Sequence, residues 1–212
     1  EQYPSIWLEH VYDSIMYAKL EKDGIGLAEN TVNLFMDNQT EDGQLPCYIL
    51  NGAKPHMAEM KLVGYSQIQE VVSFHNLCLE LYRLTNDKNL LEKAYESGKK
   101  WVLWLKNNRM TMKKGLIEMF CGYDTGHDES ARLEGLSCSG NYKVDGVAQN
   151  AAIFPEGEKV APILAVDMNC NYYATLKALC EMAHILEKGA EADKWNNEAS
   201  NTKKLIFEQL YD

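Results

Sequence analysis

Apolar residues recur along most of this chain at spacings of three and four positions, which is the period of an amphipathic α-helix. The pattern predicts helices over residues 5–20, 28–36, 65–84, 88–107, 167–187 and 190–210. Asp23-Gly24-Ile25-Gly26 indicates the end of the first helix, and Asp42-Gly43 indicates a turn-rich loop after the second. The chain is therefore expected to be all-α.

The predicted helices differ in how much of their surface is apolar. Those at 65–84 and 167–187 are apolar on most sides, whereas those at 88–107 and 190–210 have one polar face. A buried helix thus precedes a half-exposed one, which fits a toroid of helical hairpins whose inner helices line an axial cavity. A plain helical bundle or a superhelical repeat array would show the same alternation, but the irregular connections favour an enzyme over a repeat scaffold.

The helical period disappears between about residues 109 and 166. A span this long without a regular pattern in a compact domain is typical of a functional loop. Gly122 and Gly126 allow the backbone to fold back, because glycine adopts a positive φ at little cost. We expect this turn to present Asp128 to a cavity as part of a catalytic loop.

Other charged residues of this loop belong to the same candidate site. Arg132 offers a planar fork of donors that can hold a carboxylate or a sugar hydroxyl, and Asp124 lies between the two glycines. The alternative interpretation is that the acidic residues are solvated loop charges, with Asp124 or Ser130 capping a helix.

Composition and charge narrow the class of partner. The 212 residues are 46% hydrophobic, so residues 1–212 can bury a sizeable core as a single domain. The net charge is −10 and basic residues do not cluster, which argues against nucleic acid and anionic membranes as partners. No apolar run approaches the ~18 residues of a membrane span, and no signal peptide is recognised.

The cysteines lack the spacing of a metal site or a disulfide framework. No C-x-x-C pair occurs and most cysteines lie in apolar surroundings, so they are expected to be reduced core residues. This favours a reducing, cytoplasmic compartment, and no cofactor or metal is expected. The six are Cys47, Cys78, Cys121, Cys138, Cys170 and Cys180.

Four motifs follow one another along almost the whole chain: Tyr3-Pro4-Ser5-Ile6-Trp7, Asn38-Gln39-x-x-Asp42-Gly43-x-Leu45-Pro46, the loop from Asp124 to Arg132, and Val166-Asp167-Met168-Asn169. Together they resemble the (α/α)6-barrel glycosidases of glycoside hydrolase family 63 and the related mannosylglycerate hydrolases and trehalases. The loop of that family tends to be Glu-Ser-Gly-x-Asp-Asn-Ser-Pro-Arg, and here it is Asp124-Thr125-Gly126-His127-Asp128-Glu129-Ser130-Ala131-Arg132. By this match Asp128 takes the place of the general acid. The family's Trp-x-Trp-Asp near the first helix stands here as Trp7-Leu8-Glu9-His10.

The chemistry of glycoside hydrolysis fits these residues. One carboxylic acid must protonate the leaving oxygen while a second carboxylate activates water or attacks. The apolar neighbours Phe120 and Tyr123 are expected to raise the pKa of Asp128, as a general acid requires. The predicted substrate contacts are Trp7, Gln69, Glu70, Asp124, Arg132, Asp167, Asn169 and Tyr172. Aromatic residues at helical spacing are also common in cores, and Asp167 fits an N-cap as well.

The resemblance implies a ring of six hairpins, of which the pattern predicts about three. The family's catalytic base, a glutamate, belongs to the last hairpins, so the chain is expected to be about half of an (α/α)6 barrel or a truncated relative without the base. The expected activity is inverting hydrolysis of an α-linked glucoside or mannoside. Half a toroid would expose apolar flanks, which predicts a homo-oligomer or pairing with the other half.

Two other functions remain open. In a non-catalytic carbohydrate-binding or assembly module, Asp128 would only bond sugar hydroxyls. An epimerase or lyase on the same toroid would need a pair of catalytic histidines, which the five histidines do not clearly supply.

Overall fold

The computed structural model describes residues 5–50, 62–65, 67–68, 70–127, 131, 143–144, 147–148 and 162–211. Six α-helices lie within these ranges: α1 (His10–Leu20), α2 (Gly24–Asp37), α3 (Phe74–Thr85), α4 (Lys88–Asn108), α5 (Val166–Ile185) and α6 (Gly189–Leu210). A single turn of 3₁₀-helix, η1 (Gly122–Thr125), follows α4, and the strands are short. The predicted all-α class is confirmed.

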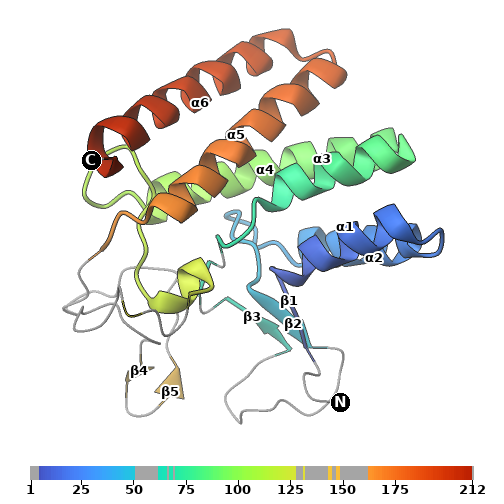
Figure 1. The fold of residues 1–212 in the computed structure, drawn as a ribbon, viewed down its shortest axis with the longest axis horizontal. Coiled ribbons are helices and arrows are strands. Elements are labelled where there is room, and N and C mark those ends of the chain that lie inside the picture. Colours follow the sequence, from blue (N-terminus) through green and yellow to red (C-terminus); the bar gives the residue numbers. More distant parts are fainter. Residues whose placement is uncertain are drawn as a thin grey trace.

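The helices form three antiparallel hairpins, α1/α2, α3/α4 and α5/α6 (Figure 1). Short connections enforce this pairing. Between α3 and α4, Asn86 takes a left-handed φ of 55°, and the Asp87 side chain accepts hydrogen bonds from the backbone N–H groups of Asn89 and Leu90. These are a C-terminal stop and an N-cap placed side by side, so one helix ends and the next begins within three residues.

The first helices of the three hairpins adjoin one another, since α3 packs against both α1 and α5. Ion pairs connect them: Lys19 of α1 lies 2.9 Å from Glu80 of α3, and Arg83 of α3 lies 2.7 Å from Glu181 of α5. Arg83 also pairs with Glu80. This arrangement of inner helices is that of a partial helical toroid.

A small antiparallel sheet lies beside the helices, near the beginnings of α1 and α3 (Figure 1). Its strands are β1 (Ser5–Trp7), β2 (Tyr48–Leu50) and β3 (Val63–Gly64), in that order. In the region between α4 and α5, β4 (Lys143–Val144) pairs with β5 (Val147–Ala148).

The main core lies between the helices and is rich in aromatic residues. Trp101 and Trp104 stack with ring centroids 5.3 Å apart, and the indole N–H of Trp195 donates to the Tyr95 hydroxyl at 3.0 Å. Gly98 allows the close approach of α4 to α5, because a Cβ there would lie only 2.5 Å from a methyl group of Leu179.

Two predicted boundaries at the first hairpin are wrong. Residues 5–7 form β1, because their backbone pairs with β2 and the Trp7 ring packs 4.9 Å from that of Tyr48. Gly24 begins α2 instead of ending the preceding segment. A Cβ at Gly24 would lie 2.8 Å from atoms of Tyr17 and Ala18, so the glycine permits a tight connection between α1 and α2.

The predicted helix at 65–84 begins only at Phe74. The backbone before Phe74 hydrogen-bonds to side chains that are distant in the sequence, instead of to the backbone groups of a helix. Gln44 donates to the Tyr65 carbonyl at 3.1 Å, and the Ile68 N–H donates to Asp124 at 3.0 Å. Tertiary contacts therefore hold the described residues of this segment in turns instead of a helix.

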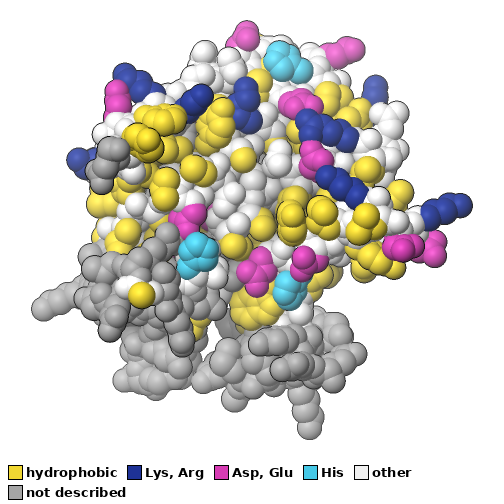
Figure 2. Space-filling model, in the orientation of Figure 1, with side chains coloured by type: hydrophobic (Ala, Val, Ile, Leu, Met, Phe, Trp, Pro, Cys, Tyr) yellow, Lys and Arg dark blue, Asp and Glu magenta, His cyan; other side chains and the backbone are white. Residues whose placement is uncertain are grey.

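Apolar side chains are exposed on α1, and Figure 2 shows hydrophobic side chains gathered over the α1/α2 region. Tyr12, Met16 and Leu20, one turn apart, are 51%, 39% and 78% exposed. Contiguous apolar surface of this kind is typical of a contact face. In the part of the chain that the structure describes, no helix has the length and apolar character needed to cross a membrane.

Candidate active site

The candidate loop is anchored by an ion pair in the protein interior. Asp124, in η1, and Arg109, directly after α4, are both fully buried, with the Nη1–Oδ2 and Nη2–Oδ1 atoms 2.7 and 3.2 Å apart. Three backbone N–H groups complete the carboxylate shell, those of Phe120 (2.8 Å), Cys121 (3.2 Å) and Ile68 (3.0 Å). Asp124 therefore fixes the loop, and its oxygens face these donors instead of a substrate space.

The segment between α4 and η1 is ordered by buried polar contacts. The Arg109 guanidinium donates to the Glu118 carbonyl at 2.9 Å and lies 4.1 Å from the centre of the Phe120 ring. The Glu118 carboxylate, also fully buried, accepts from the Thr111 N–H and hydroxyl (2.9 and 2.6 Å) and from the Met112 N–H (2.6 Å). These bonds replace the helical ladder, which explains why the sequence here has no period.

A glycine turn ends η1, as the sequence predicts. Gly126 has a φ of 69°, and Gly122 begins η1. A Cβ on Gly126 would lie 2.7 Å from a methyl group of Val71 and 3.6 Å from Oε2 of Glu9. The turn is therefore packed against the segment that precedes α3 and against the residue that precedes α1.

The next residue reaches the beginning of α5. His127 Nδ1 lies 3.4 Å from Oδ2 of Asp167, and the two side chains are 54% and 29% exposed. Asp167 lies in the first turn of α5, where Ala165 is the N-cap, so Asp167 is not the cap that the alternative interpretation expected. The carboxylates of Glu9 and Asp167 thus lie beside the turn that leads to Asp128.

Glu70, a predicted substrate contact, lies in the interior. Its side chain is 2% exposed, Oε2 accepts from the Trp101 indole N–H at 3.3 Å, and Oε1 has no hydrogen-bond partner among the described residues. Burial raises the pKa of this carboxyl to about 8, against smaller opposing effects of the Trp101 N–H and the Arg109 charge. Burial therefore favours the neutral form of Glu70 at pH 7. The backbone carbonyl of Glu70 accepts a hydrogen bond from the Asn171 side-chain amide at 2.9 Å.

Two other predicted contacts also make internal bonds. The fully buried Asn169 amide donates to the carbonyls of Ile117 (3.0 Å) and Ala165 (2.9 Å) and accepts from the Ile117 N–H (2.8 Å). Tyr172 is 1% exposed and its hydroxyl donates to Glu198 of α6 at 3.0 Å. Both side chains tie α5 to its neighbours, which supports structural roles.

Of the remaining predicted site residues, the structure describes one and leaves three outside the described ranges. Trp7 is half-buried against Tyr48 in the small sheet. Gln69, Asp128 and Arg132 lie outside the described residues. Asp167 is thus the predicted contact that combines partial exposure with a position beside the loop.

Two residues that shape the loop are not predicted by the sequence analysis. Arg109 follows the end of a predicted helix, and no local motif pairs it with an aspartate 15 residues later. Glu9 lies within the Trp7–His10 motif, and this position is the one feature of the sequence that could have indicated a role for Glu9 near the loop.

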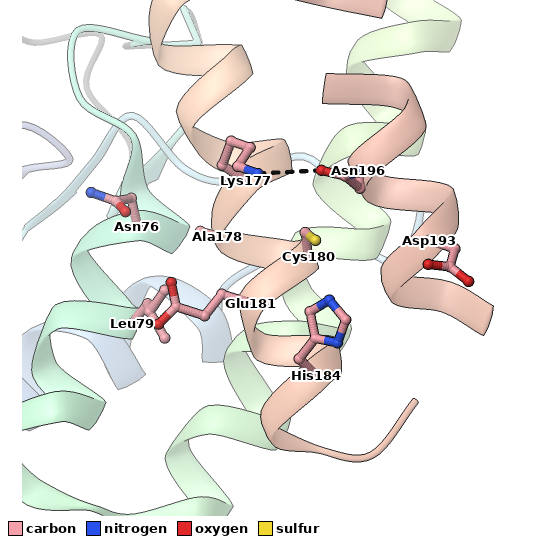
Figure 3. Close-up of a pocket in the computed structure, with 9 residues that line it drawn as sticks. All are labelled: Asn76, Leu79, Lys177, Ala178, Cys180, Glu181, His184, Asp193 and Asn196. Atoms are coloured by element: carbon pink, nitrogen blue, oxygen red, sulfur yellow. Dashed lines mark hydrogen bonds between the residues drawn. The ribbon is translucent and has the colours of Figure 1, made fainter. Parts of the chain in front are cut away.

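A cavity of about 410 Å³ lies apart from this loop, between α3, α5 and α6 (Figure 3). Its lining contains basic and acidic side chains, with Lys177, Glu181 and His184 on α5 and Asp193 on α6. Lys177 bonds to Asn196 at 3.3 Å. None of the predicted site residues lines this cavity.

Within the described ranges, no group of three or more His, Cys, Asp or Glu side chains is arranged to hold a metal ion. Cys47, Cys78, Cys121 and Cys180 are buried cysteines outside any disulfide, and Cys170 is an exposed one. Burial raises the pKa values of the Cys78 and Cys121 thiols, so both remain protonated and unreactive.

The fold is similar to three crystal structures from Thermus thermophilus. Two are of a glycoside hydrolase family 63 mannosylglycerate hydrolase. The complex with Tris has a TM-score of 0.74 at 13% identity and covers 98% of this chain and 60% of that one, and the complex with glucose has 0.68 at 14%, covering 98% and 58%. The third is an uncharacterized conserved protein, with a TM-score of 0.67 at 14% identity, covering 95% and 56%.

The chain thus spans between half and two thirds of the length of these structures. No curated protein matches the sequence. The sequence does match, over residues 18–212, the family described as the mannosylglycerate hydrolase MGH1-like glycoside hydrolase domain. This match includes α2 to α6 and the loop with Asp124, and the chain therefore belongs to that glycoside hydrolase family.

Proposed function

We propose that this chain forms the acid-bearing part of a glycoside hydrolase catalytic domain, with Asp128 as the general acid. In the proposed step, the Asp128 carboxylic acid protonates the glycosidic oxygen as the bond from that oxygen to the anomeric carbon breaks. A water molecule, deprotonated by a base outside the three hairpins, attacks the opposite face of the sugar and inverts the anomeric configuration. The proposed substrate class is an α-linked glucoside or mannoside.

The observation that carries this proposal is the anchoring of the loop that leads to Asp128. The buried Arg109–Asp124 pair holds this loop in place, and the turn at Gly126 packs beside Glu9 at the start of α1. Family membership and the likeness to a mannosylglycerate hydrolase bound to glucose support the same function. Asp167, at the start of α5, is the described side chain best placed to contact a sugar hydroxyl.

The proposal is tested by Asp128→Asn in the full-length protein, which keeps the size of the side chain and removes the transferable proton. Hydrolysis of glycosides with poor leaving groups should fall by about 10² to 10⁴, which is the usual contribution of a general acid. Activated aryl glycosides should lose much less, because a good leaving group needs little protonation. Asp193→Asn, an exposed residue on α6, is the matched control and should leave both activities unchanged.

Full activity of the Asp128→Asn variant on both substrate types would contradict the assignment. If the wild-type protein binds sugars but hydrolyses neither substrate type, the carbohydrate-binding or assembly module is the correct function. Detection of the first-formed anomer by NMR tests inversion separately.

The exposed apolar face of α1 also bears on assembly. The family fold extends beyond the span covered here, so we propose that this face packs against the rest of the toroid or against a second copy of the chain.

A further inference from the structure

The Arg109 side chain joins three separate points of the loop that precedes Asp128. It holds the Glu118 carbonyl at 2.9 Å, both oxygens of the Asp124 carboxylate, and the face of the Phe120 ring at 4.1 Å. All of these contacts are in the interior, since the Arg109 and Asp124 side chains have no exposed surface. We infer that Arg109, acting through Asp124, is a positioning residue that sets the location of the general acid; this inference rests on the proposed function.

The geometry requires an arginine. A planar guanidinium donates to both carboxylate oxygens at once and stacks on an aromatic ring, whereas a lysine ammonium is a point charge without a fixed fork. Lysine at this position would keep the positive charge that Asp124 needs but lose the two-point contact and the stacking. The substitution therefore separates charge from orientation.

The chain from Asp124 to Gly126, which leads toward the proposed acid, is short and packed. Asp124 is the third residue of η1, Gly126 makes the left-handed turn, and Asp128 is four residues after Asp124. The turn has little freedom, because Gly126 lies against Val71 and Glu9. A rotation of η1 is thus passed along the chain, and a displacement of ~1 Å at a reacting group can reduce a rate by about 100-fold.

A positioning role and a purely structural role predict different kinetics. Loss of fold reduces the amount of active protein, so hydrolysis of all substrates falls by the same factor. A misplaced acid instead slows glycosides with poor leaving groups more than activated aryl glycosides. The ratio of the two kcat values is therefore the readout, with circular dichroism and the unfolding midpoint measured on the same samples.

The test compares Arg109→Lys with Arg83→Lys in the full-length protein. Arg83 is a matched control, because it is an exposed arginine of α3 that also pairs with carboxylates. In Arg109→Lys the kcat ratio of activated to unactivated substrate should rise by about 10- to 100-fold, whereas in Arg83→Lys it should not change. Asp124→Asn, which keeps the shape and removes the charge, should shift the ratio in the same direction.

An unchanged ratio in a folded Arg109→Lys protein would overturn the inference, and so would failure of both Arg109→Lys and Asp124→Asn to fold. These results can be told apart from failure of the proposed function. If Asp128→Asn shows the leaving-group effect and the Arg109 variant does not, the inference alone is wrong. If Asp128→Asn is fully active on both substrates, or the wild type hydrolyses neither, both are wrong.

Discussion

Replacement of Glu70 by glutamine should make the protein less sensitive to alkaline pH. Glu70 is buried and its pKa is raised from 4.5 to about 8, so the folded state keeps its proton over a range in which the unfolded chain has lost it. Wild-type stability from this group is complete below pH 4.5 and is lost as pH rises toward 8. Glutamine has the same shape, retains an acceptor for the Trp101 N–H and does not titrate.

The size of the effect follows from the pKa difference. Between pH 4.5 and 8 the wild-type free energy of unfolding should fall by about 1.4 kcal/mol per pH unit from this group, to at most roughly 5 kcal/mol. The pKa of about 8 already includes the smaller opposing effect of the nearby Arg109 charge. The Glu70→Gln variant should therefore be close to wild type at pH 5 and more stable by several kcal/mol at pH 9.

Urea unfolding at pH 5, 7 and 9 measures this difference directly. Glu80→Gln is a control of opposite sign, because the Lys19 and Arg83 partners lower the pKa of Glu80. These ion pairs stabilise the fold fully above pH 4.5, and their contribution is lost as pH falls through the lowered pKa. Glutamine at this partly exposed position should cost no more than about 1 kcal/mol at pH 7 and nothing in acid. Parallel pH profiles for wild type and Glu70→Gln would show that Glu70 does not titrate in this range.

Two further pairs of substitutions test a strained glycine and a buried side-chain amide. Gly43→Ala should lower stability by about 1–3 kcal/mol, because φ is 108° and the new Cβ would lie 2.4 Å from the Lys100 carbonyl oxygen; Gly26→Ala has open space in α2 and should gain up to about 1 kcal/mol. Equal shifts of the two unfolding midpoints would contradict this reasoning. Asn169→Ala should cost about 2–5 kcal/mol by leaving the Ile117 N–H and carbonyl unpaired, whereas Asn196→Ala, on the exposed face of α6, should be nearly neutral in the same urea titration.

Helices with a clear polar face can be predicted closely from the sequence. The expected spans 88–107 and 190–210 agree within a residue or two with α4 and α6, because each has a strong helical period and Asp87 caps the start of α4. The expected span 65–84 is too long at its start. Ile68 and Val71 continue the apolar spacing of α3, but they are apolar because they pack under the loop, and a period alone does not distinguish the two causes.

The location of the candidate site is easier to predict than the direction of its side chains. The loop that contains Asp124 does reach the start of α5, where His127 contacts Asp167. A loop motif and a helix start in the sequence suggest this arrangement. Asp124 is turned inward, however, because its partner Arg109 comes from the end of another element. A pairing of this kind depends on the tertiary fold, and a motif read along the chain contains no information about it.

Three buried carboxyl groups near the loop are stabilised in three different ways. Asp124 is paired with Arg109, Glu118 accepts three local hydrogen bonds, and Glu70 keeps its proton. Buried acids of this kind do not stabilise a fold more than apolar side chains of the same volume would. Their directional bonds instead fix where the backbone between α4 and Gly126 lies, and this is the property that the general acid proposed at Asp128, two residues later, would require. Substitutions that preserve burial but alter these bonds should therefore affect catalysis more than they affect the helical content of the protein.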